Sequence, residues 1–186
     1  MPSYQDIQFS KEELARYNRH MIMPEFGLVA QQKLKAAKVL AVSVDPLDKH
    51  QGWVKDINET QNVTVNFPII ADPDRTVANL YGMIHPNSSE NFTVRSLFII
   101  GPDKKVKLTI TYPASTGRNF HEVLRVLDSL QLTANYSVAT PADWNRGEDV
   151  IVVPAVSTED AIKKFPKGVN IVKPYLRYTP QPDLPE

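Results

Sequence analysis

The sequence predicts an α/β domain with a mixed β-sheet, a leader of two helices and an extended C-terminal arm. Three observations carry this prediction. Apolar runs of strand length alternate with helical patterns between residues 38 and 132, as in sheets whose strands are joined by helices. Two helical patterns precede the first apolar run, and seven of the 15 prolines follow residue 133. With 186 residues, 42% of them hydrophobic, the chain is long enough to bury a real core.

The leader opens with a capping signature at residues 10–13, Ser-Lys-Glu-Glu. The Ser10 hydroxyl can accept a hydrogen bond from a backbone N–H of the first turn, while the Glu13 carboxylate reaches back to the cap. A helix is therefore expected over residues 11–21. Residues 28–37 are rich in Ala, Gln, Lys and Leu, all good helix formers, and predict a second helix.

The sheet is expected to begin with the apolar run at residues 38–44, which Asp45-Pro46 ends. A helix should follow over residues 47–59. Residues 63–70 predict another strand, interrupted at Pro68. Because proline has no N–H to donate to a β-ladder, this segment should be an edge strand or a strand end.

Asp72 is expected to cap a short helix that follows it. Residues 94–100 and 106–112 are apolar runs on either side of the sequence Gly-Pro-Asp-Lys-Lys, which predicts an antiparallel hairpin with a five-residue loop. Residues 118–130 then give the clearest helix, with apolar residues gathered on one face.

After residue 133 the prolines make helix improbable, apart from a short one over residues 158–165. Residues 150–153 predict one short strand. Because this segment lacks the periodicity of a self-contained core, it is expected to be an arm packed on the main body or on a partner. The chain thus divides into a leader (1–37), a core (38–132) and an arm (133–186).

Composition excludes several classes of function. The 21 basic and 21 acidic residues cancel, which argues against general binding to nucleic acid or to an anionic membrane. No apolar stretch approaches the roughly 20 residues of a membrane span, and the N-terminus does not resemble a secretory signal, so we expect a cytoplasmic protein. The absence of cysteine removes disulfides, thiolate metal sites and every thiol mechanism.

The residue types and their spacing give few candidates for a functional site, and no cofactor is expected. The four histidines show no metal-ligand spacing, so no metal site is predicted; they are His20, His50, His85 and His121. Asp45, Asp48 and His50 follow the end of a strand, where α/β proteins often place sites. The alternative, a turn followed by a helix N-cap with acidic residues favoured by the helix dipole, is preferred.

Two arginines are the remaining candidates. Arg95 stands near the start of an apolar strand, where a guanidinium must be paired or must point into a polar cleft. Arg118 opens the helix after the hairpin. Two such groups close together would suit an anion or a polarised oxygen, and structural salt bridges are an equally good interpretation.

Several motifs between about residues 38 and 182 are diagnostic of a known family. They are Trp53-Val54-Lys55-Asp56-Ile57, Leu80-Tyr81-Gly82-Met83, Tyr112-Pro113-Ala114-Ser115-Thr116-Gly117-Arg118-Asn119, Thr140-Pro141-Ala142-Asp143-Trp144, Phe165-Pro166-Lys167-Gly168 and Tyr175-Leu176-Arg177-Tyr178-Thr179-Pro180-Gln181-Pro182. With these motifs in collinear order over most of the chain, the sequence resembles the one-cysteine peroxiredoxins of the peroxiredoxin-six type.

The resemblance implies a thioredoxin-like fold, a homodimer formed through the core edge and the C-terminal arm, and an antioxidant oxidoreductase that reduces hydrogen peroxide and organic hydroperoxides. By position, Arg95 and Arg118 resemble the family's two active-site arginines. The family's thiolate lies in a Pro-x-x-x-Thr/Ser-x-x-Cys motif at a helix N-terminus. That motif, its strand and its helix are missing here, so the catalytic set is empty and peroxidase activity is not expected.

Some relatives also carry a phospholipase activity that needs a Ser and a His near the N-terminus. Asp103 resembles the acidic partner, and it alone remains, so this activity is not expected either. The missing strand lies inside the family's sheet. Residues 39–44 could close the gap by pairing directly with residues 94–100, or the leader helices could cover the exposed face.

The leader carries a different set of motifs, Phe9-Ser10-Lys11-Glu12-Glu13-Leu14-Ala15-Arg16-Tyr17-Asn18-Arg19-His20, Met23-Pro24-Glu25-Phe26-Gly27 and residues 31–40. With these motifs it resembles the ThiF/MoeB/HesA-type adenylyltransferases, and the resemblance puts Arg19 at the position of an arginine that reaches a neighbouring protomer's ATP. Where that family has a Gly-rich nucleotide loop, this chain has Ser43-Val44-Asp45-Pro46. The chain thus resembles a fusion of two families at residues 38–40, of natural or artificial origin.

Four functional hypotheses follow. The favoured one is an inactive peroxiredoxin-like pseudoenzyme that acts through dimerisation or binding. A peroxidase with retained activity, which the lack of cysteine opposes, is the second. A non-functional fusion fragment is the third, and an ATP-dependent adenylyltransferase is the weakest, since the glycine loop is absent.

Overall fold

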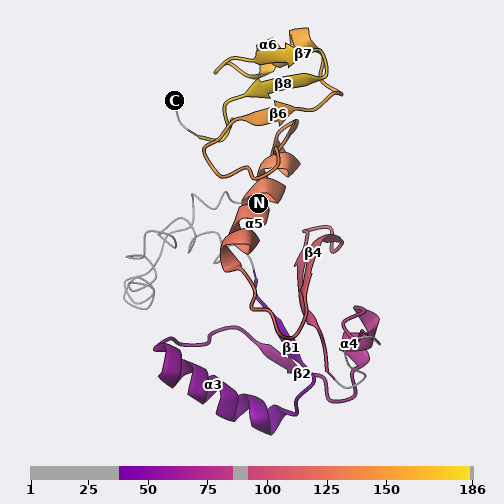
Figure 1. Cartoon of the computed structure of the whole chain (residues 1–186), viewed down its shortest axis with the longest axis vertical. Helices are drawn as coiled ribbons and strands as arrows, with labels where there is room; N and C mark the ends of the chain where they lie inside the picture. The colour runs from indigo at the N-terminus through magenta and orange to yellow at the C-terminus, as the bar shows by residue number, and fades with distance from the viewer. Residues whose placement is uncertain (1–37, 86–91, 185–186) are drawn as a thin grey trace. The chain divides into compact units, whose positions relative to one another are not determined.

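A computed structural model of the chain describes residues 38–85 and 92–184 (Figure 1). The helices expected over residues 11–21 and 28–37 lie outside these ranges, as does Arg19. Contacts divide the chain into two compact units. The first includes residues up to Phe98 together with Thr109–Arg118, and the second comprises Ile99–Leu108 and the residues from Asn119 onward.

The first unit begins with a β-α-β arrangement. Strand β1 (Ala41–Ser43) pairs in parallel with β2 (Ile69–Ala71), with Val42 opposite Ile70. Helix α3 (Leu47–Gln61) joins them and contacts β2, and it runs beside the pair in Figure 1. The helix ends at Asn62, whose φ of 52° lies in the left-handed region that asparagine tolerates. The predicted helix is confirmed, while β1 is shorter than the expected strand.

The strand expected over residues 63–70 is wrong for most of its length. Only Ile69 and Ile70 of that range belong to β2. Pro68 cannot donate to the ladder, but its carbonyl accepts the N–H of Ala41 at 3.0 Å, so it stands at the strand's start. The backbone N–H of Val65 is instead taken by the Asn58 side-chain oxygen at 2.8 Å. A local side-chain bond has replaced a strand pairing there.

The carboxylate of Asp72 binds the first turn of the next helix, α4 (Thr76–Leu80), as expected of a capping side chain, although the N-cap residue itself is Arg75. Its two carboxylate oxygens accept the N–H groups of Val77 at 3.1 Å and Ala78 at 2.8 Å. The cap is buried, since Asp72 is 5% exposed. The end of α4 is fixed by Tyr81, whose ring packs edge-on against Phe98 with centroids 5.1 Å apart.

Strands β3 (Arg95–Ile100) and β4 (Val106–Tyr112) form a separate two-stranded sheet. Gly101 N–H donates to the Lys105 carbonyl at 2.9 Å, which closes the predicted turn. The direct pairing of residues 39–44 with residues 94–100, one of the two possible ways to close the sheet, is wrong, because within the described ranges β1 pairs with β2 and β3 with β4. The other way, coverage by the leader helices, lies outside the described residues. A hairpin closed by a short turn satisfies its own backbone at less entropic cost than a distant strand does.

Helix α5 (Phe120–Asn135) starts two residues later than expected, because Asn119 caps it. The Asn119 side-chain oxygen accepts the N–H groups of His121 at 3.0 Å and Glu122 at 3.3 Å. Arg118 therefore precedes the helix. The buried side of α5 carries Val126 and Leu132.

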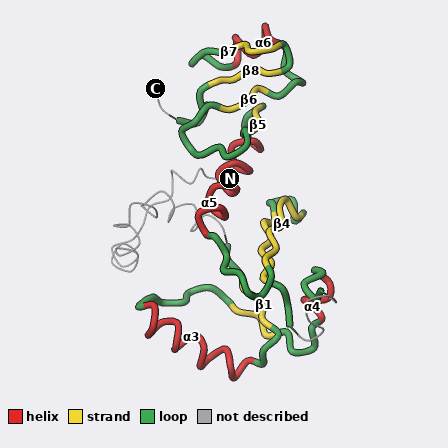
Figure 2. The backbone as a smooth tube through the Cα atoms, in the orientation of Figure 1, coloured by secondary structure: helices red, strands yellow, loops and turns green. Residues whose placement is uncertain are grey.

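The second unit contains a four-stranded antiparallel sheet in the order β5-β6-β8-β7. Its strands are β5 (Val138–Ala139), β6 (Val150–Val152), β7 (Asn170–Lys173) and β8 (Leu176–Thr179), with helix α6 (Thr158–Lys164) between β6 and β7. Figure 2 shows the strands as short yellow segments separated by long green loops.

This sheet has its own core, contrary to the expectation of an arm without one. The buried cluster consists of Leu132, Val138, Trp144, Val150, Val152, Ala161 and Phe165. Apart from Val150 and Val152, which share β6, its members come one at a time from different short elements and loops, so no long sequence period marks them. Trp144 is 1% exposed and its indole N–H donates to the Glu148 carbonyl at 3.0 Å.

Hydrogen bonds from buried polar side chains hold the loops of the second unit in place. The Arg177 guanidinium, 2% exposed, donates to the carbonyls of Val156 at 2.7 Å and Val153 at 3.1 Å. The Gln181 side-chain oxygen accepts the N–H of Gly147 at 2.6 Å. Such bonds hold irregular backbone where a regular ladder is absent. Within the described ranges, no helix is long and apolar enough to cross a membrane.

Candidate functional site

The two candidate arginines lie at the ends of elements in the first unit. Arg95 opens β3 and Arg118 lies just before the N-cap of α5. Both residues are exposed, and neither guanidinium makes a hydrogen bond or ion pair with another residue of the described ranges. The alternative that Arg95 is paired is therefore wrong among the described residues, because the residue stands at an exposed strand start, and the alternative of a polar cleft stays a prediction. Their family roles stay a prediction.

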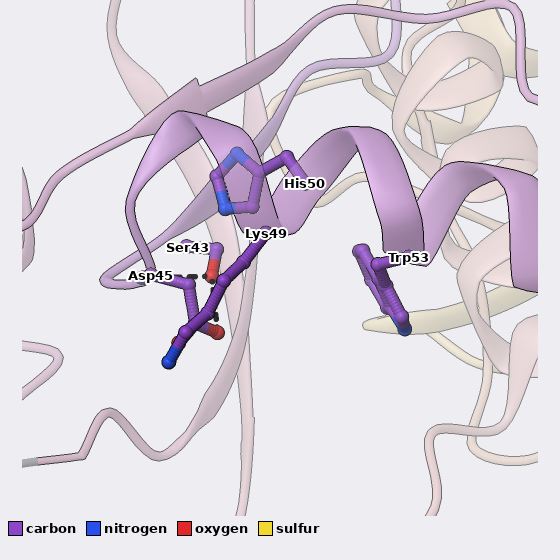
Figure 3. A pocket seen from close by; sticks show the side chains of 5 residues that line it. All are labelled: Ser43, Asp45, Lys49, His50 and Trp53. Carbon is purple, nitrogen blue, oxygen red and sulfur yellow. Dashed lines mark hydrogen bonds between the residues drawn. The ribbon is translucent and has the colours of Figure 1, made fainter.

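The structure brings together two of the three residues predicted after the first strand, Asp45 and His50, but not Asp48. A hollow of about 300 Å³ at the N-terminal end of α3 is lined by Ser43, Asp45, Lys49, His50 and Trp53 (Figure 3). Asp48 lies in the first turn of α3, where a carboxylate favours the helix dipole, and does not line the hollow. The pattern missed Lys49 and Trp53, although their four-residue spacing places both on one helix face.

The turn interpretation of Asp45 is confirmed, and the N-cap interpretation is wrong. The Ser43 hydroxyl donates to an Asp45 carboxylate oxygen at 3.3 Å and accepts the Asp45 N–H at 3.2 Å, as the dashed lines in Figure 3 mark. The N-cap residue of α3 is Pro46, and no side chain caps this end.

His50 is the buried member of this group. It is 4% exposed, and neither ring nitrogen has a hydrogen-bond partner among the described residues. His85 and His121 are exposed, and His20 lies outside the described residues. The described part of the chain contains no group of three side chains arranged to hold a metal ion.

Asp103 lies in the β3–β4 turn and is engaged by basic neighbours. Its carboxylate accepts the Lys107 ammonium at 2.7 Å and the Lys105 N–H at 3.2 Å. The hydrogen bond from Lys107 lowers the pKa of Asp103 below its ordinary value. These contacts are those of a turn-stabilising carboxylate.

A second ion pair, missed by the sequence analysis, links α5 to the Trp144 loop. Arg125 donates to both carboxylate oxygens of Glu122, at 2.6 and 2.8 Å, and to the Trp144 carbonyl at 3.2 Å. The bond from Arg125 lowers the pKa of Glu122 and the same bond raises the pKa of Arg125. The three-residue spacing on a helix was the available signal.

Comparison with known proteins gives two family matches. Residues 21–109 match the model of the AhpC/TSA family, and residues 129–168 match the C-terminal domain of 1-Cys peroxiredoxin. The first match begins inside the segment expected to be the leader. The 1-Cys peroxiredoxin of Dictyostelium discoideum is 58% identical over 163 residues, which cover 86% of this chain and 68% of that protein. Peroxiredoxin-6 of Mus musculus is 52% identical over 174 residues, 87% of this chain and 75% of that protein.

Solved structures agree with the sequence comparisons. A cysteine-to-serine variant of the peroxiredoxin 6 of Arenicola marina matches with a TM-score of 0.74 and 43% identity over 96% of this chain and 83% of that one. The yeast mitochondrial 1-Cys peroxiredoxin matches with a TM-score of 0.74 and 40% identity over 93% of this chain and 82% of that one. The thioredoxin-like fold is thereby confirmed. This chain belongs to the 1-Cys peroxiredoxin family.

Proposed function

We propose that this chain is a peroxiredoxin-family domain without peroxidase chemistry of its own, and that it acts through binding and homodimerisation. The observation that carries the proposal is the absence of cysteine from all 186 residues. Peroxide reduction by a protein thiol begins when a thiolate attacks the O–O bond and becomes a sulfenic acid. No other side chain here can make that step reversibly.

The described surroundings of the two arginines support the same proposal. Arg95 and Arg118 are exposed. A guanidinium that stabilises a reacting anion works best in a desolvated site where water does not screen it. Exposed arginines without a thiolate to bind have no nucleophile to activate.

Consumption of hydrogen peroxide tests this proposal. The purified chain is incubated with peroxide and either dithiothreitol or glutathione, and the Dictyostelium relative serves as the positive control. We expect the rate with this chain to equal the rate of reductant alone. Turnover that scales with protein concentration and falls in an Arg95→Ala variant would contradict the proposal.

Homodimerisation is supported by an exposed sheet edge in the second unit. Strand β7 pairs on one side with β8, and Ile171 and Val172 are each 49% exposed. An apolar edge strand is a template for pairing with a second copy. Sedimentation velocity should give a dimer, and an Ile171→Lys/Val172→Lys variant should give a monomer with an unchanged circular dichroism spectrum. A monomer at all concentrations would contradict this part.

The proposal also covers the domain boundaries of the chain and its location in the cell. We keep residues 1–37 as an adenylyltransferase-like leader, 38–132 as the core and 133–186 as the arm, with the AhpC/TSA match overlapping the leader from residue 21. No ATP–pyrophosphate exchange is expected. We also propose a cytoplasmic location, which cell fractionation tests.

A further inference from the structure

We draw no further inference here: the strongest candidate, the edge of the apolar strand β3 that faces away from β4 and has no strand partner among the described residues, carries no proposal, because nothing in the structure shows what covers it.

Discussion

The two units of this chain differ in how completely each buries its apolar residues. In the second unit, eight described hydrophobic residues are buried: Val126, Leu132, Val138, Trp144, Val150, Val152, Ala161 and Phe165. In the first unit, three are buried: Ala78, Met83 and Val94. Large apolar side chains are exposed in both units, among them Leu47 and Leu80 in the first and Phe120 and Tyr175 in the second, so the difference lies in the buried residues.

The sheets differ in the same way. The second unit has four antiparallel strands with a packed face. The first unit has the β1–β2 pair, which is parallel and three residues long. Parallel strands are normally covered on both faces, and sheets of two strands are marginal by themselves. We infer that the second unit supplies most of the chain's stability, whereas the first unit carries the candidate sites.

The largest loss of stability is expected from a substitution in the core of the second unit. Trp144→Ala removes a fully buried side chain and should lower the free energy of unfolding by about 3–5 kcal/mol. A denaturant titration followed by circular dichroism measures this loss. Trp53→Ala, on a half-exposed residue, is the matched control and should cost less than about 1 kcal/mol. Equal losses in the two variants would contradict the inferred difference between the units.

A second variant tests the buried guanidinium. Arg177→Met leaves the carbonyls of Val153 and Val156 without their side-chain donor, so it should destabilise the chain by about 2–3 kcal/mol. The exposed Arg118→Met is its control and should have no measurable effect on the denaturation midpoint. If Arg177→Met unfolds at the wild-type midpoint, the hydrogen bonds from Arg177 to the loop carbonyls do not contribute to stability.

Helix caps should give smaller, local effects. Asp72→Ala removes the acceptor of two N–H groups of α4 and should speed amide exchange of Val77 and Ala78, corresponding to about 1 kcal/mol. Asn119→Ala should do the same for His121 and Glu122 in the second unit. If the amide exchange rates of α4 do not change in Asp72→Ala, the first unit already opens at equilibrium in the wild type. The difference in stability between the two units would then be larger than inferred.

The smallest effect concerns pH. Because the hydrogen bond from Arg125 holds the pKa of Glu122 below its ordinary value, folding gains stability above the unfolded pKa and loses it as pH falls through the folded pKa. Arg125→Met should raise the pKa of Glu122 toward its ordinary value, which NMR of the carboxyl carbon can follow. Glu122 would then titrate alike in the folded and unfolded chain, so the variant should be less stable than the wild type at neutral pH and should lose less stability in acid. An unchanged titration would mean that the pair does not persist in solution.

Local signals predicted much of the fold. Asp72 and residues 101–105 were found because a cap and a turn depend on a few adjacent residues. The prediction of a strand over residues 63–68 was wrong because the side chain of Asn58, seven residues before Val65, accepts the N–H of Val65. The core around Trp144 was missed because its members are spread over elements of two to seven residues and one helix end, so no window contains a repeat.

The candidate site was predictable only in part. Asp45 and His50 were found from their place after a strand, and the hollow contains both. The burial of His50 without a partner is a property of the folded chain that no local pattern encodes. Arg95 was expected to be paired because its strand is apolar, but β3 has only β4 as a described neighbour and leaves its first residue exposed.

Hydrogen exchange of the full chain tests the difference between the units most directly. Amides of β6 and β8 should exchange slowest, at a rate set by global unfolding, whereas those of β1 and β2 should exchange through local opening at least about a hundredfold faster. Exchange of all four strands at one common rate would contradict the account, because it would mean that the first unit unfolds only together with the second.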